Sequence, residues 1–217
     1  MARREMSTAS DFDYLVVAHG LIEDASRLRS FRAAYFHEDH SDSSGSSRFL
    51  LNDVTRYWRT IAVDYQAKVW RDLSVDGWGL RYLKLRISRK LTYVSALVAL
   101  FLVEIAKPSD VHGFLREQFV DVPALARVAQ LVDVLDGDDR ALLDLRRVLE
   151  LADAFCGFLH DRERRDAATR VLPPAREATD AAFVEMRTAS VELESCLERL
   201  FFDAAPLRGL SRKYLAF

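Results

Sequence analysis

The sequence is poor in cysteine, in net charge and in long apolar runs, and each shortage excludes a class of protein. Its two cysteines, Cys156 and Cys196, form neither a disulfide framework nor a metal-ligand spacing, which predicts a reducing, cytoplasmic setting. The formal net charge is -2, so the molecule as a whole has no field that attracts nucleic acid or an acidic membrane. Any such affinity has to come from a local patch.

No segment has the character of a membrane span or of a secretory signal. The longest apolar run covers residues 91–103, well short of the roughly 20 residues that cross a bilayer. The charged residues 1–5 have no apolar stretch behind them. Because 50% of the residues are hydrophobic, we expect a soluble protein with a substantial core and no membrane partner.

Apolar residues that recur at steps of three and four predict helices over most of the chain. The expected helices cover residues 21–36, 48–73, 78–106, 122–135, 139–163 and 175–202. The one convincing strand is the short, partly β-branched run at residues 13–18. The predicted fold is mainly α, a bundle of about five to six helices with a short N-terminal segment that carries the strand.

A polar, serine-rich stretch divides the chain. Residues 38–47 contain five serines and a glycine among charged neighbours, a composition typical of a flexible linker. We therefore expect an N-terminal segment at residues 1–37, a linker at 38–47 and a helical bundle domain at 48–217.

Asp11 and Asp13 stand where the N-terminal strand begins. Side chains two residues apart on a strand point to the same face, so the two carboxylates can hold one divalent cation while Phe12 and Tyr14 pack on the other side. A metal held in this way neutralises charge on phosphate oxygens during phosphoryl transfer. The alternative is a pair of surface carboxylates in a turn.

The helix predicted at residues 78–106 begins with a cationic segment, and no acidic residue occurs between Trp78 and Val103. Helical spacing places Arg86, Lys90 and Tyr93 on one face, and Arg81, Lys84 and Ser88 on another. Either row can face a phosphate or a nucleic-acid backbone. In the alternative, the cationic face is solvated and neutralised by acids of the preceding helix: Asp53, Asp64 or Asp72.

The preceding helix, predicted at residues 48–73, carries polar groups suited to a nucleotide. Asn52 can hydrogen-bond a base or a ribose, and Arg56 and Arg59 can bind phosphate oxygens. A plain exposed face is the alternative. Trp58 and Trp78 can supply a stacking platform, although aromatic residues at helical spacing usually belong to the core.

Three blocks resemble bacterial nucleotidyltransferase-domain proteins of the DNA polymerase β-like superfamily. They are Ser-Asp-Phe-Asp-Tyr-Leu-Val-Val at residues 10–17, the helical residues 48–60, and the block at residues 78–91. The resemblance covers about residues 3–105. It implies a remnant of an α/β nucleotidyltransferase domain at the N-terminus.

The same resemblance implies a reaction and a set of site residues. The reaction is the Mg²⁺-dependent transfer of a nucleoside monophosphate from a nucleoside triphosphate to an unknown acceptor. Asp11 and Asp13 are the implied catalytic residues and metal ligands. The implied nucleotide- or acceptor-binding residues are Ser10, Asn52, Arg56, Arg59, Lys84 and Arg86.

The sequence departs from the family pattern in two places. A Gly-Ser pair should precede Asp11, and a third carboxylate should follow on a later strand, but neither occurs in a suitable context. The catalytic domain is therefore expected to be truncated. Because a lone strand gives two aspartates no rigid platform, we expect weak metal binding and little or no transferase activity.

Two other functions stay open beside the nucleotidyltransferase. One is a noncatalytic helical binding module that recognises a protein partner or RNA through the basic face. The other is a ribonuclease, because Arg32 and His37 form an Arg-x4-His pair similar to the signature of HEPN-type ribonucleases. A homo-oligomer is also open.

Overall fold

The computed structural model describes residues 46–71, 77–173 and 180–215. The predicted strand, the predicted helix at residues 21–36 and nearly all of the linker lie outside these ranges. All the regular structure within the described ranges is helical. The prediction of a mainly α fold is therefore confirmed for this part of the chain, and the domain boundaries stay a prediction.

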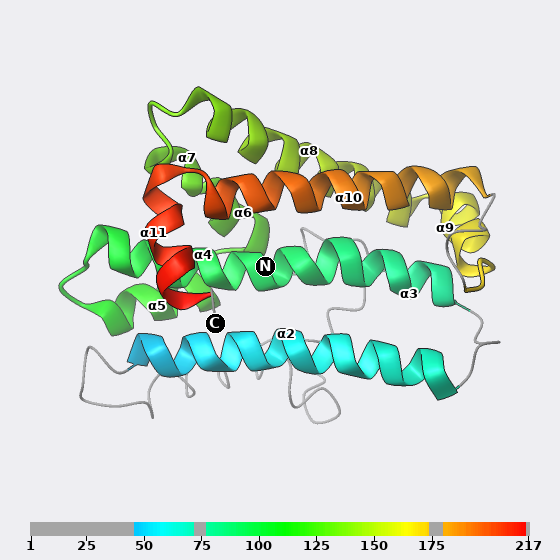
Figure 1. Cartoon of the computed structure of the whole chain (residues 1–217), viewed down its shortest axis with the longest axis horizontal. Helices are drawn as coiled ribbons and strands as arrows, with labels where there is room; N and C mark the ends of the chain where they lie inside the picture. Colours follow the sequence, from blue (N-terminus) through cyan, green and yellow to red (C-terminus); the bar gives the residue numbers. More distant parts are fainter. Residues whose placement is uncertain (1–45, 72–76, 174–179, 216–217) are drawn as a thin grey trace.

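Two predicted long helices are present near their expected positions. Helix α2 covers Ser46–Arg71. The next helical stretch is continuous but has three parts: α3 (Trp78–Lys84), a π-helical turn η3 (Leu85–Arg89) and α4 (Lys90–Ala106). Figure 1 shows this stretch between α2 on one side and α10 on the other.

The C-terminal half is divided more finely than its periodicity predicts. Its helices are α5 (Val111–Val120), α6 (Ala124–Ala129), α7 (Leu131–Val134), α8 (Asp139–His160), α9 (Arg162–Thr169), α10 (Ala181–Phe202) and α11 (Ala205–Tyr214). The single helix expected at residues 122–135 is thus two short ones. The one expected at 139–163 ends at His160, because the Asp161 carboxylate accepts a bond from the Arg164 amide at 3.1 Å and starts α9.

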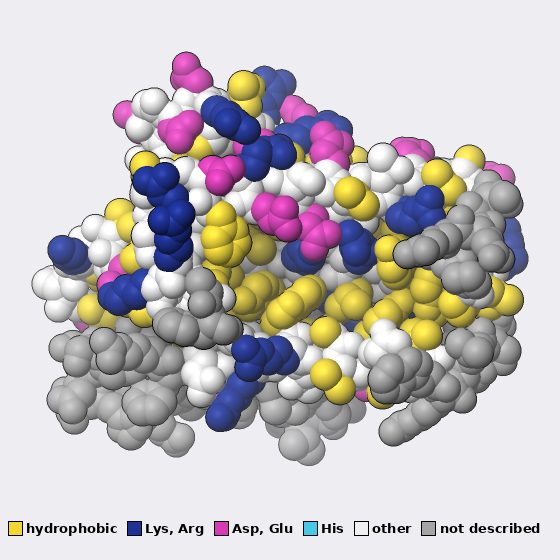
Figure 2. All heavy atoms as spheres, viewed as in Figure 1, with side chains coloured by type: hydrophobic (Ala, Val, Ile, Leu, Met, Phe, Trp, Pro, Cys, Tyr) yellow, Lys and Arg dark blue, Asp and Glu magenta, His cyan; other side chains and the backbone are white. Residues whose placement is uncertain are grey.

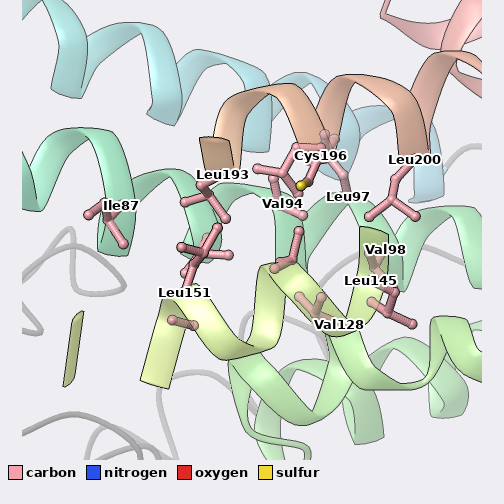
Figure 3. Close-up of a cluster of buried hydrophobic side chains, with 14 of the residues drawn as sticks. Ile87, Val94, Leu97, Val98, Val128, Leu145, Leu151, Leu193, Cys196 and Leu200 are labelled. Atoms are coloured by element: carbon pink, nitrogen blue, oxygen red, sulfur yellow. The ribbon is translucent and has the colours of Figure 1, made fainter. Parts of the chain in front are cut away.

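Helix α4 forms the centre of the bundle. Nearly all of its residues from Leu91 to Val103 are buried, as expected for a helix that is apolar on every side. In Figure 3 its side chains meet those of α6, α8 and α10. The fully packed layer includes Val98, Val128, Leu145, Leu193 and Leu200.

Two glycines set the close packing of α3 on the end of α9. Gly77 has φ +87°, which favours glycine, and its amide donates to the Thr169 carbonyl at 3.0 Å. A Cβ on Gly79 would lie 2.3 Å from the Ala168 carbonyl oxygen. Only a residue without a side chain allows this approach.

Reciprocal arginine–carboxylate pairs join α8 to α10. Arg147 on α8 donates to both carboxylate oxygens of Glu192 at 2.7 and 2.9 Å, and Arg199 on α10 donates to Asp144 at 2.5 and 2.9 Å. The hydrogen bonds from Arg199 lower the pKa of Asp144 against the opposing effect of burial. Such two-point pairs fix the relative position of the two helices.

Candidate functional site

The residues predicted to hold a metal lie outside the described part of the chain. These residues are Asp11 and Asp13. Ser10, Arg32 and His37 also lie outside the described ranges. Among the described residues, no group of three side chains could hold a metal ion. The structure therefore leaves the magnesium site, the nucleotide contact of Ser10 and the ribonuclease pair as predictions.

Arg86 and Lys90, the two cations of the first predicted row, face α10. Arg86 donates from Nη2 to the Glu194 carboxylate at 2.7 Å and from Nε to Ser190 Oγ at 2.9 Å. Lys90 Nζ donates to the other Glu194 oxygen at 2.5 Å. The alternative interpretation paired this row with acids of the preceding helix; in the structure these two cations bind a carboxylate more than 100 residues further along the chain.

The two cationic partners of Glu194 stabilise the ionised form of its carboxyl group. Burial acts to raise the pKa of its carboxyl group, but the bonds and charges of Lys90 and Arg86 outweigh burial and hold the pKa below its usual range. The result is a compact network of two cations and one anion, half-buried between α4 and α10.

The second predicted cationic row is split between the interior and the surface. Lys84 is only 6% exposed, whereas Arg81 is exposed to solvent. The Ser88 hydroxyl donates to the Lys84 carbonyl at 3.1 Å and so stays within its own helix. Arg81, Lys84 and Ser88 thus present no common open face to a phosphate.

A π-helical turn lies within the cationic segment. Residues Leu85–Arg89 form this turn, which includes Arg86. Single π-turns inside α-helices are rare and recur at functional sites, because they redirect side chains at a local cost in helix geometry. The irregular turn is therefore consistent with a functional role for this side of the helix.

Helix α2 packs on α4, and one of its contacts is with Tyr93. The Trp58 ring stacks on the Tyr93 ring with centroids 5.3 Å apart. Burial raises the pKa of the Tyr93 phenol, while a hydrogen bond with Thr55 and the charge of Arg59 partly oppose the increase. Arg59 itself is exposed, as are Asn52 and Arg56.

Two hollows lie along the side of α10 that packs on the α3–η3–α4 stretch, and α2 contributes Trp58 to the smaller of them; together we call them the α2–α10 groove. One, of about 250 Å³, is lined by apolar and aromatic side chains together with Lys90, Glu194 and Glu198; the aromatic ones are Trp58, Tyr93, Phe201 and Phe202. The other, of about 630 Å³, is lined by Tyr82, Arg86, Arg187, Thr188, Val191 and Glu192.

The α2–α10 groove has an apolar floor and charged rims. In Figure 2 a band of hydrophobic side chains separates the acidic side chains on α10 from basic side chains on α2. Trp58 is half-buried and lines the smaller hollow, whereas Trp78 is buried against Tyr82 and Phe183. The core interpretation of the aromatic residues holds for Trp78.

The sequence indicated one wall of this groove and missed the other. The helical row Arg86, Lys90 and Tyr93 does line it. The α10 wall was not predicted, although a signal exists: Val191 and Phe202 are 53% and 43% exposed, and both lie on the face that also carries Glu194 and Glu198. Large apolar side chains that are exposed among charged ones indicate a binding surface.

Comparison of the chain with protein-family models, with curated proteins and with solved structures found no match. No family is therefore shown, and the resemblance to nucleotidyltransferases stays a prediction. None of the described helices combines the length and apolar character that crossing a membrane would require.

Proposed function

We propose that this protein is a noncatalytic helical binding module that holds a segment of a partner protein in the α2–α10 groove. The observation that carries the proposal is the open, aromatic-rich floor formed by Trp58, Tyr93 and Phe202 on three different helices. Aromatic side chains at the centre of a hollow supply most of the energy of protein association, because they bury a large rigid surface.

The charges of the groove favour a protein over RNA as the partner. A phosphate would have to compete with Glu194 for Arg86 and Lys90, because the carboxylate already binds both cations. The exposed carboxylate of Glu198 lines the same hollow and would repel a phosphate backbone. The polar groups at the edge therefore suit a partner that brings charges of both signs.

The test compares two exposed apolar residues, one that lines the groove and one that lies outside it. The full chain, a Phe202→Glu variant and a Leu143→Glu variant are recovered from cells of the source organism, and co-purifying proteins are quantified by mass spectrometry. Leu143 is the matched control, because it is 64% exposed on α8 and does not line the groove.

The proposal expects a partner that is lost with Phe202→Glu and retained with Leu143→Glu. Equal recovery from the two variants would contradict it. Recovery that depends on intact RNA would favour the alternative of an RNA-binding module.

A second proposal is the magnesium-dependent nucleotidyltransferase activity that the resemblance implies. It is supported by the sequence Ser10-Asp11-Phe12-Asp13 and by the exposed Arg56 and Arg59 on α2. Incorporation of labelled nucleotide that requires Mg²⁺ and is abolished by Asp13→Ala is the expected result. Absence of magnesium binding in calorimetry, with and without a nucleotide analogue, would remove this proposal.

A further inference from the structure

The α10 side of the groove presents a stripe of side chains with the spacing of a helix-binding surface. Val191, Glu194, Glu198 and Phe202 follow one another at steps of three, four and four residues, and all four line the two hollows. The stripe is about 16 Å long at roughly 1.5 Å per residue. This length matches about three turns of an α-helix laid beside α10.

The two rims of the groove carry opposite charges without an ion-pair partner among the described residues. Glu198 is exposed on α10, and it forms no ion pair within the described ranges, unlike Glu194. Arg59 is exposed on α2; it does not line either hollow, but its charge acts on the phenol of Tyr93, which lines the smaller one. An occupant between the rims therefore meets one negative and one positive group on opposite sides.

The direction of the surrounding helices also fits a helical occupant. Arg86 bonds to Ser190 and Lys90 bonds to Glu194, so α10 runs beside the η3–α4 stretch in the same direction with a constant offset. Figure 1 shows α2 on the opposite side of α4 from α10. A further helix lying on α4 between them would complete a four-helix packing around the apolar floor.

We propose that the occupant is an amphipathic helix of a partner protein, about three turns long, with its apolar face on Trp58, Tyr93 and Phe202. One flank of this helix carries a Lys or Arg beside Glu198, and the other carries an Asp or Glu beside Arg59. The proposal rests on the proposed binding function and specifies the partner for that same groove.

The alternatives for the occupant differ in what they require. A β-strand occupant needs unpaired backbone groups along the groove, whereas the walls are helices whose backbone bonds are internal. A helix satisfies its own backbone and needs only a surface for its side chains. The apolar floor with one charge on each rim provides that surface.

The experiment selects peptides without imposing a conformation. A displayed library of fully randomised 16-residue peptides is enriched on the intact chain. The affinity of the enriched peptides is then measured by fluorescence anisotropy for three proteins. These are the wild type, Glu198→Lys and Asp153→Lys. Asp153 is the matched control, because it is an exposed carboxylate on α8 that does not line the groove.

The enriched peptides are expected to have apolar residues at i, i+3 or i+4, and i+7, with basic residues on one flank and acidic residues on the other. Glu198→Lys should weaken their binding at least tenfold, and Asp153→Lys should change it less than twofold. Replacing the basic flank by glutamate should restore binding to Glu198→Lys.

Enriched peptides without helical periodicity, or enriched peptides that bind Glu198→Lys as tightly as the wild type, would overturn the inference. Failure to enrich any peptide would also overturn it. In each case the proposed function is judged separately, because recovery of a cellular partner that depends on Phe202 does not require the partner to be a short helix.

Discussion

Replacement of Glu194 by glutamine tests how the groove wall is held together. In the folded chain its carboxylate binds both Arg86 and Lys90, whose side chains are only 26% and 16% exposed. Glu194→Gln leaves two like charges near each other in a half-buried site. Breaking a fully buried pair costs about 3–5 kcal/mol, and an exposed pair contributes about 0.2–1 kcal/mol.

The partial exposure of Glu194, 39%, places the expected loss between these limits. We predict that Glu194→Gln lowers the free energy of unfolding by about 2 kcal/mol, because screening by water reduces the buried limit. For a chain of this size the melting temperature should fall by roughly 4–8 °C. Urea unfolding followed by circular dichroism measures the first quantity, and a thermal scan measures the second.

Two variants make the measurement specific. Glu198→Gln removes an exposed carboxylate with no ion pair among the described residues, so its cost should stay below about 0.5 kcal/mol. Adding Lys90→Met to Glu194→Gln removes one uncompensated cation and should recover part of the lost stability. A Glu194→Gln variant no less stable than Glu198→Gln would refute the assignment of the network as the support of this wall.

Two further predictions concern the helix packing that positions the groove. Gly79→Ala should cost roughly 3 kcal/mol in a urea titration, since its Cβ would meet the Ala168 carbonyl at 2.3 Å; Gly157→Ala, where a Cβ meets open space within α8, should instead stabilise by up to about 1 kcal/mol, and equal effects would contradict the packing. Arg199 lowers the pKa of Asp144 in the folded state, so the unfolded state binds the proton first as pH falls. The contribution of this pair to stability is therefore present above about pH 4 and is lost as pH falls through the folded pKa. Asp144→Asn should therefore be less stable than the wild type at pH 7 and approach it in acid, and a constant difference from pH 7 to pH 2 would be inconsistent with that linkage.

The parts of the fold that the sequence predicts are those governed by local periodicity. Helix α2 and the stretch from Trp78 to Ala106 carry long apolar stripes, and both occur within a few residues of the expected bounds. The C-terminal helices are shorter, and their limits depend on single residues. Asp161 ends one helical segment and caps the next, a role that a continuing helical pattern conceals.

The candidate site was predictable only where one helix determines it. The spacing of Arg86, Lys90 and Tyr93 places them on one face whatever surrounds them, and all three line the groove. Their partner Glu194 could not be predicted, because the pairing depends on the packing of α10 against α4 and not on any sequence neighbour. The burial of Lys84 has the same origin, since tertiary packing decides which cations face solvent.

The most direct test of the groove as the binding site is site-specific photo-crosslinking in living cells. A photoreactive side chain is placed at Arg59 on α2, at Glu198 on α10 or at Leu143 on α8 as the control, and the adducts are mapped by mass spectrometry. We expect positions 59 and 198 to crosslink to the same segment of one protein and position 143 to form no such adduct. Adducts that form equally at all three positions, or from neither rim, would contradict this expectation.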